Sequence, residues 1–134
     1  MAKLLEVRNL TVGKTCLQGK KKPDILKAAD NISFSIDEGE IVGLAGESGC
    51  GKTMTALSIT NLLPQPFQIL NGDIIFNSQS LTSMSEQELC RIRGKEIGII
   101  FQDAKQALNP LMKIGLQIME VLEMTGFSDM LTII

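Results

Sequence analysis

The chain has 134 residues, of which 44% are hydrophobic and 21% are charged, as in one ordinary globular domain. A net charge of -2 gives no general attraction to nucleic acid, so no nucleic-acid partner is expected. No run of about 18 apolar residues is free of charges, so no membrane span is expected, and no signal peptide is expected either. The three cysteines form no CxxC pair and histidine is absent, which disfavours a zinc site and indicates a reducing, cytoplasmic compartment.

The first part of the chain predicts strands and turns. Residues 4–12 and 31–36 alternate between apolar and polar side chains, as half-buried strands do. Residues 13–24 between them have the Gly, Lys and Pro of an exposed connection, and residues 37–39 (Asp-Glu-Gly) predict a tight turn. Residues 40–45 have a core, IVGLA, that is apolar on both faces, which predicts a strand buried in the middle of a sheet.

The rest of the chain alternates helices and strands. A helical pattern starts at Gly51 and is stopped by the prolines at 64 and 66. Residues 72–76 predict a strand after an Asn-Gly turn, residues 97–101 a buried strand, and residues 114–124 a helix with an apolar stripe. Ser85 and Glu88 fit a capping box that opens a short helix. These elements predict an α/β fold with an antiparallel β portion near the N-terminus. The inward side of the first helix is expected to carry Met54, Leu57, Ile59 and Leu62.

The main chemical motif is GESGCGKT at residues 46–53, which fits the phosphate-loop pattern G-x-x-x-x-G-K-[ST] between a predicted strand and a predicted helix. The glycines let successive backbone N–H groups point at one anion at a helix N-terminus. Lys52 would reach the β- and γ-phosphates, and the Thr53 hydroxyl would bind Mg²⁺. The alternative is a glycine-rich turn that binds nothing, which the lysine, the threonine and both flanks disfavour. The predicted nucleotide-binding residues in this loop are Gly46, Glu47, Ser48, Gly49, Cys50, Gly51, Lys52 and Thr53.

Two further polar positions and one thiol carry hypotheses. Gln102 ends the predicted strand 97–101 and could contact Mg²⁺ or an attacking water. Asp103 is the rival Mg²⁺ ligand, although Gln102 separates it from the apolar run, and both could simply be exposed residues at a strand end. Cys50 lies beside Lys52 at a helix N-terminus, a setting that activates thiols. Its alkylation is hypothesised to block nucleotide binding; the alternative is that this position only tolerates a small residue.

Three segments together resemble the ATP-binding subunits of ATP-binding cassette importers, most closely the dipeptide, oligopeptide and nickel branch. They are EIVGLAGESGCGKT, GDIIFNSQSLTSMSEQEL and EIGIIFQDAKQALNPLMKIGLQIMEVL. The resemblance implies a P-loop NTPase-type core that binds Mg-ATP, and it identifies Gln102 as the Q-loop glutamine, which contacts Mg²⁺ where membrane subunits dock. It also implies a second ATP-binding subunit as partner, a peptide or nickel cargo, and a peripheral position on the cytoplasmic side of the cell membrane.

The chain departs from the family pattern in two ways. The signature motif, a Walker B strand ending in Asp-Glu, and a switch histidine are not found in residues 1–134. We therefore expect this chain to be the N-terminal portion of an ATP-binding domain, unable to hydrolyse ATP alone and prone to aggregate. Alternatives are a non-catalytic remnant, or another P-loop NTPase or kinase that uses Asp103 for Mg²⁺. The family also stacks adenine on an aromatic residue near Gly13 or Lys14, but the first aromatic residue here is Phe34, so weakened base binding is expected.

Overall fold

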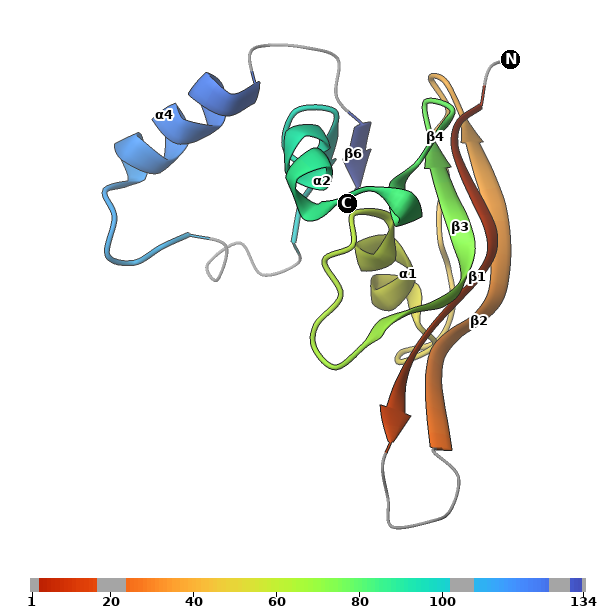
Figure 1. Ribbon diagram of the computed structural model, residues 1–134. Coiled ribbons are helices and arrows are strands. Elements are labelled where there is room, and N and C mark those ends of the chain that lie inside the picture. Colours follow the sequence, from red (N-terminus) through yellow and green to blue (C-terminus); the bar gives the residue numbers. More distant parts are fainter. Residues whose placement is uncertain (1–2, 17–23, 102–107, 126–130, 134) are drawn as a thin grey trace. The chain divides into compact units, whose positions relative to one another are not determined.

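The computed structural model describes residues 3–16, 24–101, 108–125 and 131–133 (Figure 1). The chain divides into two compact units, Met1–Met84 and Ser85–Ile134. The first contains the phosphate-loop sequence and the helix that directly follows it, and the second contains the later α-helices.

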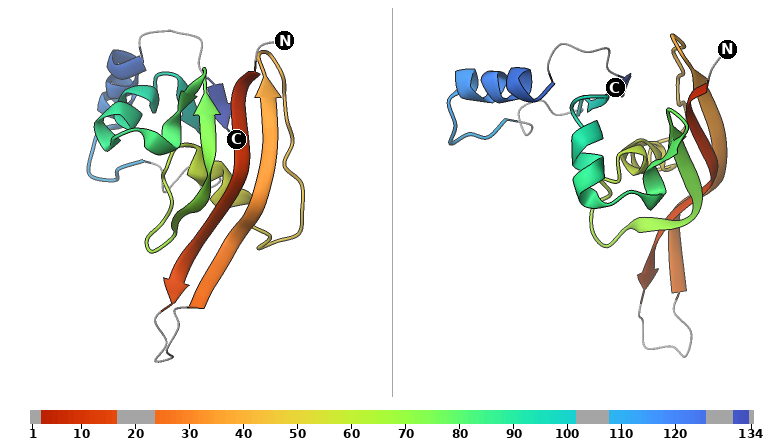
Figure 2. Two further views of the ribbon diagram at one scale, coloured as in Figure 1. Left: turned by 45° about the vertical axis from the view of Figure 1, so that its right-hand side comes forward. Right: turned by 45° about the horizontal axis from the view of Figure 1, so that its top comes forward.

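The first unit is built on a four-stranded antiparallel sheet, which Figures 1 and 2 show as a long curved ribbon. Its strands are β1 (Lys3–Cys16), β2 (Asp24–Asp37), β3 (Gln68–Phe76) and β4 (Gln79–Ser80), in the order β2-β1-β3-β4. The three predicted strands are confirmed, but each is longer than predicted. The predicted connection at 13–24 is wrong at its ends, because residues 13–16 continue β1 and pair with 24–27 of β2.

Bulges give this sheet its curvature. Asn9 in β1 and Asn31 in β2 have left-handed backbones, with φ of 49° and 52°, and their side chains are hydrogen-bonded at 3.0 Å. The predicted Asn-Gly turn before residue 72 is wrong, because Asn71 and Gly72 lie inside β3. Gly72 has a φ of 96°, and a Cβ built there would lie 2.6 Å from the backbone of β1. The dipeptide therefore forms a bulge, where a left-handed residue without a side chain is needed.

The hydrophobic core of the first unit lies between the sheet and helix α1 (Lys52–Ile59). The helix is confirmed, but it ends earlier than the prolines suggest, because Asn61 turns the chain with a φ of 53°. Ile59 is buried as predicted, Met54 and Leu57 are half-buried, and Leu62 lies beyond the helix and is exposed. The inward expectation is therefore wrong for Leu62. The buried apolar residues of this core are Leu5, Val7, Leu10, Val12, Ala29, Ile59, Ile74, Phe76 and Leu81.

Asp73, within β3, is the centre of a cluster of polar side chains. The Asp73 carboxylate accepts hydrogen bonds from the Ser80 hydroxyl at 2.6 Å, the Ile74 backbone N–H at 2.8 Å and the Thr82 hydroxyl of the short 3₁₀ helix η1 (Leu81–Ser83). These donors, led by Ser80, lower the pKa of Asp73. The carboxylate thereby ties β3 to the segment that follows β4.

The predicted strand at 40–45 is absent. The Asp-Glu-Gly turn before it is confirmed, since the Glu40 N–H donates to the Asp37 carbonyl at 3.1 Å and Gly39 has a φ of 76°. Beyond the turn, however, residues 41–47 form no strand, and Ile41 and Leu44 are 98% and 52% exposed. A strand that is apolar on both faces needs paired neighbours and covered faces. Among the described residues no strand pairs with this segment.

The second unit contains helix α2 (Glu86–Ile92), strand β5 (Ile97–Ile99), helix α4 (Ile114–Thr125) and strand β6 (Leu131–Ile133), which pairs with β5 in parallel. The capping box is confirmed: the Glu88 N–H donates to Ser85 Oγ, and the Ser85 N–H donates to Glu88 Oε2 at 2.7 Å. Strand β5 is shorter than predicted. Ile97 is buried, but Ile100 and Phe101 follow the strand and are exposed. The predicted helix at 114–124 is confirmed as α4.

Candidate functional site: the phosphate loop

The phosphate-loop residues form a tight turn into helix α1. The Cys50 N–H donates to the Glu47 carbonyl at 3.3 Å, and the helix begins at Lys52, immediately after Gly51. Gly49 and Gly51 have φ values of 81° and 96°, which residues with a side chain rarely adopt. Two glycines are therefore required for the chain to turn this sharply into the helix.

The loop rests on the backbone of strand β2. A Cβ built on Gly51 would lie 2.1 Å from the Ala28 carbonyl oxygen, so only glycine allows this approach. At the other end of the loop, a Cβ built on Gly46 would lie 2.7 Å from Cys50 Sγ. The two fixed glycines of the motif thus differ: Gly51 meets backbone and allows the loop to pack on the sheet, whereas Gly46 meets the end of the Cys50 side chain, which can rotate away.

The ammonium group of Lys52 lies over the loop. Its Nζ donates to the carbonyl oxygens of Gly46 at 2.8 Å and Glu47 at 2.7 Å, and it lies 3.6 Å from Cys50 Sγ. The lysine therefore holds a positive charge where the loop, the helix N-terminus and the exposed backbone meet. This arrangement favours an anion. The Cys50 thiol is exposed beside it, and its proposed sensitivity to alkylation stays a prediction.

A small cavity of about 170 Å³ opens between β2 and the start of α1. It brings together four of the predicted residues, Gly49, Gly51, Lys52 and Thr53, with Ala28 and Met54. The other predicted loop residues, Gly46, Glu47, Ser48 and Cys50, are exposed beside it. The sequence did not identify Ala28 as a site residue, because Ala28 contributes only a backbone carbonyl, against which Gly51 packs.

The donor set fits Mg²⁺ that arrives with a phosphate ligand. Across residues 3–16, 24–101, 108–125 and 131–133, no group of three or more His, Cys, Asp or Glu side chains could hold a metal ion. Thr53 offers an exposed hydroxyl next to Lys52. Mg²⁺ usually keeps several waters and binds phosphate oxygens of the substrate beside few protein ligands, so the residues here are compatible with it, and the role of Thr53 stays a prediction.

Two predicted positions lie outside the described residues. Gln102 and Asp103 fall within 102–107, outside the residues that the structure describes. Their roles stay predictions.

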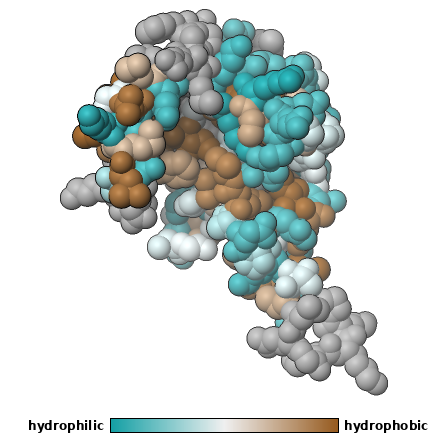
Figure 3. Space-filling model, turned by 60° about the vertical axis from the view of Figure 1, so that its left-hand side comes forward, coloured by the Kyte–Doolittle hydropathy of each residue, from teal (hydrophilic) through white to brown (hydrophobic). Residues whose placement is uncertain are grey.

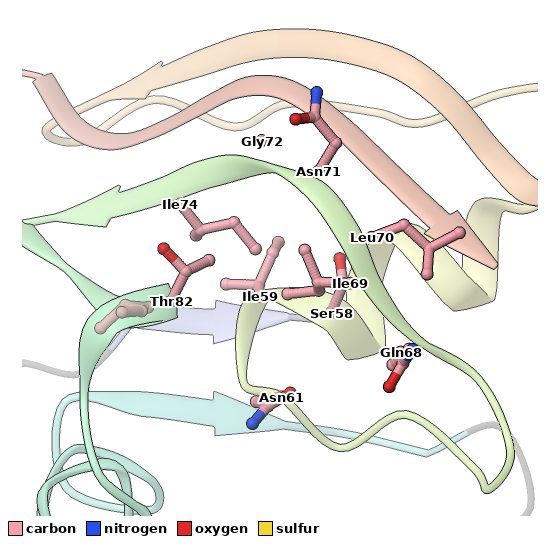
Figure 4. Close-up of a pocket in the computed structure, with 11 residues that line it drawn as sticks. Ser58, Ile59, Asn61, Gln68, Ile69, Leu70, Asn71, Gly72, Ile74 and Thr82 are labelled. Atoms are coloured by element: carbon pink, nitrogen blue, oxygen red, sulfur yellow. The ribbon is translucent and has the colours of Figure 1, made fainter. Parts of the chain in front are cut away.

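A larger cavity of about 380 Å³ lies beside the C-terminal end of α1, under strand β3 (Figure 4). None of the predicted site residues lines it, and its lining has no titratable side chain. Its walls mix amides and hydroxyls, such as Asn61, Gln68 and Thr82, with apolar side chains such as Ile59 and Ile74. It therefore offers hydrogen bonds but no charge for a phosphate.

Comparison with known proteins decides the family. A family profile described as ABC transporter matches residues 29–130, which include the whole phosphate loop. The chain belongs to the ABC transporter family. Within this family it is 46% identical over 123 residues to the oligopeptide transport ATP-binding protein AppD of Bacillus subtilis, and 41% identical over 97 residues to the dipeptide transport ATP-binding protein DppD of Escherichia coli.

The alignment with AppD covers 91% of this ABC transporter chain and 36% of AppD, and the alignment with DppD covers 72% and 30%. The chain thus spans about a third of the length of these relatives. Among solved structures, the dimeric ATP-binding cassette MJ0796 bound to ADP and Pi matches with a TM-score of 0.73 and 27% identity, over 94% of this chain and 50% of MJ0796. The predicted α/β cassette fold is confirmed.

The described helices include none with the length and hydrophobicity that crossing a membrane requires.

Proposed function

We propose that residues 46–53 bind the triphosphate of Mg-ATP, and that the chain is part of an ATP-binding subunit that energises peptide import. The observation that carries this proposal is the Lys52 ammonium, held 2.7–2.8 Å from two loop carbonyls at the start of a helix. An anion at this position meets the lysine, the backbone N–H groups of the turn and the positive end of α1 together. AppD and DppD are named for oligopeptide and dipeptide transport, which favours peptides over nickel as the cargo.

Each loop residue has a proposed role. The backbone of residues 46–51 surrounds the phosphates, Lys52 binds the β- and γ-phosphates, and the Thr53 hydroxyl holds Mg²⁺. A bound Mg²⁺ would neutralise phosphate charge. Gln102 is proposed as a further Mg²⁺ contact and as the link to membrane subunits, with a second ATP-binding subunit as the other partner.

We expect ATP binding without turnover by the 134-residue chain alone. A general base for the attacking water is not supplied by the loop itself, whose only ionisable side chains are Glu47, Cys50 and Lys52. Glu47 is at the exposed rim of the loop, and Lys52 is engaged with the carbonyl oxygens.

The test is to measure ATP affinity by isothermal titration with Mg²⁺ present. Lys52→Ala should weaken binding at least about tenfold, since hydrogen bonds to charged groups are worth about 1.5–3 kcal/mol. Lys27→Ala is the matched control, because Lys27 is an exposed lysine whose ammonium is ion-paired to Asp30 at 2.9 Å. Equal affinity for wild type and Lys52→Ala would contradict the proposal. Steady ATP turnover that Asp103→Asn abolishes would favour the kinase-like alternative.

A further inference from the structure

The fold brings an aromatic ring to the end of strand β1. The Lys14 Nζ lies 5.2 Å from the centroid of the Phe67 ring. Phe67 immediately precedes β3, and Gly13 pairs with Gln68, so the β1–β3 register places the two side chains together. The aromatic residue that the local sequence around Lys14 lacks is thus supplied from a distant part of the chain.

This pair lies on the same face of the sheet as α1. Val12 is fully buried on that face, and Lys14 comes two residues later in the same strand, so both side chains point to the same side. Phe67 is likewise two residues before Ile69, which pairs with Val12. Leu26, the partner of Lys14 in β2, is 53% exposed beside them. The three side chains therefore form a partly exposed apolar wall with one positive charge.

The wall is within reach of a nucleotide held by the phosphate loop. The loop packs against Ala28 through Gly51, and Ala28 lies two residues along β2 from Leu26. The β1–β2 register shifts here, between the pairs Val12–Ala29 and Gly13–Lys27, so the separation along β2 is at most two rises of about 3.3 Å, or about 7 Å. That is on the order of the span of a ribose, so a base attached to phosphates at the loop can reach the wall.

We propose that Phe67 and Lys14 contact the base of the bound nucleotide. The inference rests on the proposed binding of a nucleoside triphosphate at residues 46–53, and it adds the residues that contact the base. The Phe67 ring stacks on the base, and the Lys14 ammonium interacts with the base face and its ring nitrogens. Base binding is therefore stronger than expected for a chain without an aromatic residue near Lys14.

The experiment compares ATP with inorganic tripolyphosphate, which has the phosphates but no base. Phe67→Leu keeps apolar bulk and removes the π-face, and Lys14→Met keeps the aliphatic stem and removes the charge. Each should weaken ATP binding by about tenfold and leave tripolyphosphate binding unchanged. The matched control is Lys27→Met: Lys27 pairs with Gly13, next to Lys14 in the strand, and is ion-paired to Asp30. It should change neither affinity.

The outcomes separate this inference from the proposed function. If the wild type binds neither ligand, or if Lys52→Ala has no effect, both fail. If ATP binding depends on Lys52 but is unchanged in Phe67→Leu and Lys14→Met, only the base contact is overturned. An equal loss for ATP and tripolyphosphate also overturns it, because the variants would then act on the loop. Should Phe67→Leu not fold, as judged by circular dichroism, Lys14→Met alone decides.

Discussion

Gly51 and Gly49 have the same unusual backbone but different surroundings. Both have a positive φ, yet a Cβ at Gly49 meets nothing within 4 Å, whereas one at Gly51 meets the Ala28 carbonyl. Gly49→Ala is therefore expected to cost only the strain of a left-handed alanine, about 1–2 kcal/mol. Gly51→Ala should cost about 1–3 kcal/mol more, because the loop must move off the sheet.

Urea denaturation of the two variants measures this difference. ATP affinity provides a second measurement, since displacing the loop should weaken binding in Gly51→Ala more than in Gly49→Ala. Similar unfolding free energies for the two variants would mean that the loop does not pack on β2 as described.

At the level of single residues, the phosphate-loop motif has the strongest sequence signal in the candidate site. Spacing alone predicted Gly46 through Thr53, because the pattern needs only a turn, a lysine and a hydroxyl in order. Ala28 and Phe67 could not be predicted in this way. Each contributes through the register of β2 or β3 against β1, which depends on pairing between distant segments rather than on local sequence.

At the level of elements, the contribution of the capping box to the stability of α2 can be tested directly. Its capping box supplies partners for two backbone N–H groups through Ser85 and Glu88. Ser85→Ala removes the serine acceptor, and it should destabilise α2 by about 1 kcal/mol. Ser85→Asp, which retains an N-cap acceptor, is the control. Hydrogen exchange of the α2 amides measures the effect, and unchanged protection in Ser85→Ala would contradict it.

The same box has a defined pH dependence. Hydrogen bonds from the Ser85 hydroxyl and backbone N–H lower the pKa of Glu88. A carboxylate whose pKa is lower in the folded state contributes stability above its ordinary pKa, near about 4.3, and that contribution is lost as pH falls through the lowered value. Protection of the α2 amides should therefore decrease in acid, and less so in Glu88→Gln.

The element predictions that are confirmed rest on patterns within a few residues, and those that are wrong involve segments whose structure depends on pairing with distant parts of the chain. The capping box and the alternation in β1 and β2 lie within a few residues, so the sequence alone sufficed for them. The apolar run at 40–45 gave a strand signal, but a central strand exists only when neighbours pair with it. The Asn-Gly pair typical of a hairpin turn instead forms a bulge in β3 because Gly72 faces the β1 backbone.

At the level of the whole molecule, exposed apolar side chains predict self-association. Figure 3 shows apolar residues at the surface. The large apolar side chains that are exposed include Ile41, Val42 and Leu44 before the phosphate loop, and Ile114, Leu116, Ile118, Met119 and Val121 in α4. Unpaired apolar segments of this kind associate in water. A net charge of only -2 provides little repulsion to oppose it.

Replacing Ile41 and Leu44 together with lysine should reduce this association. Sedimentation velocity at increasing protein concentration measures it, and the variant should remain at lower mass than the wild type. Leu62→Lys is the control, since Leu62 is exposed but isolated on the turn after α1. A wild-type chain that is monomeric throughout the concentration range would contradict the expectation.

The contact between Lys52 and the carbonyls of Gly46 and Glu47 also bears on the thermodynamics of binding. The ammonium has already exchanged part of its water shell for protein oxygens before any ligand arrives. A phosphate therefore replaces carbonyl dipoles as well as the remaining water around this group. Part of the dehydration of the cation thus occurs during folding, and affinity for a triphosphate reflects in part the difference between two sets of oxygen partners.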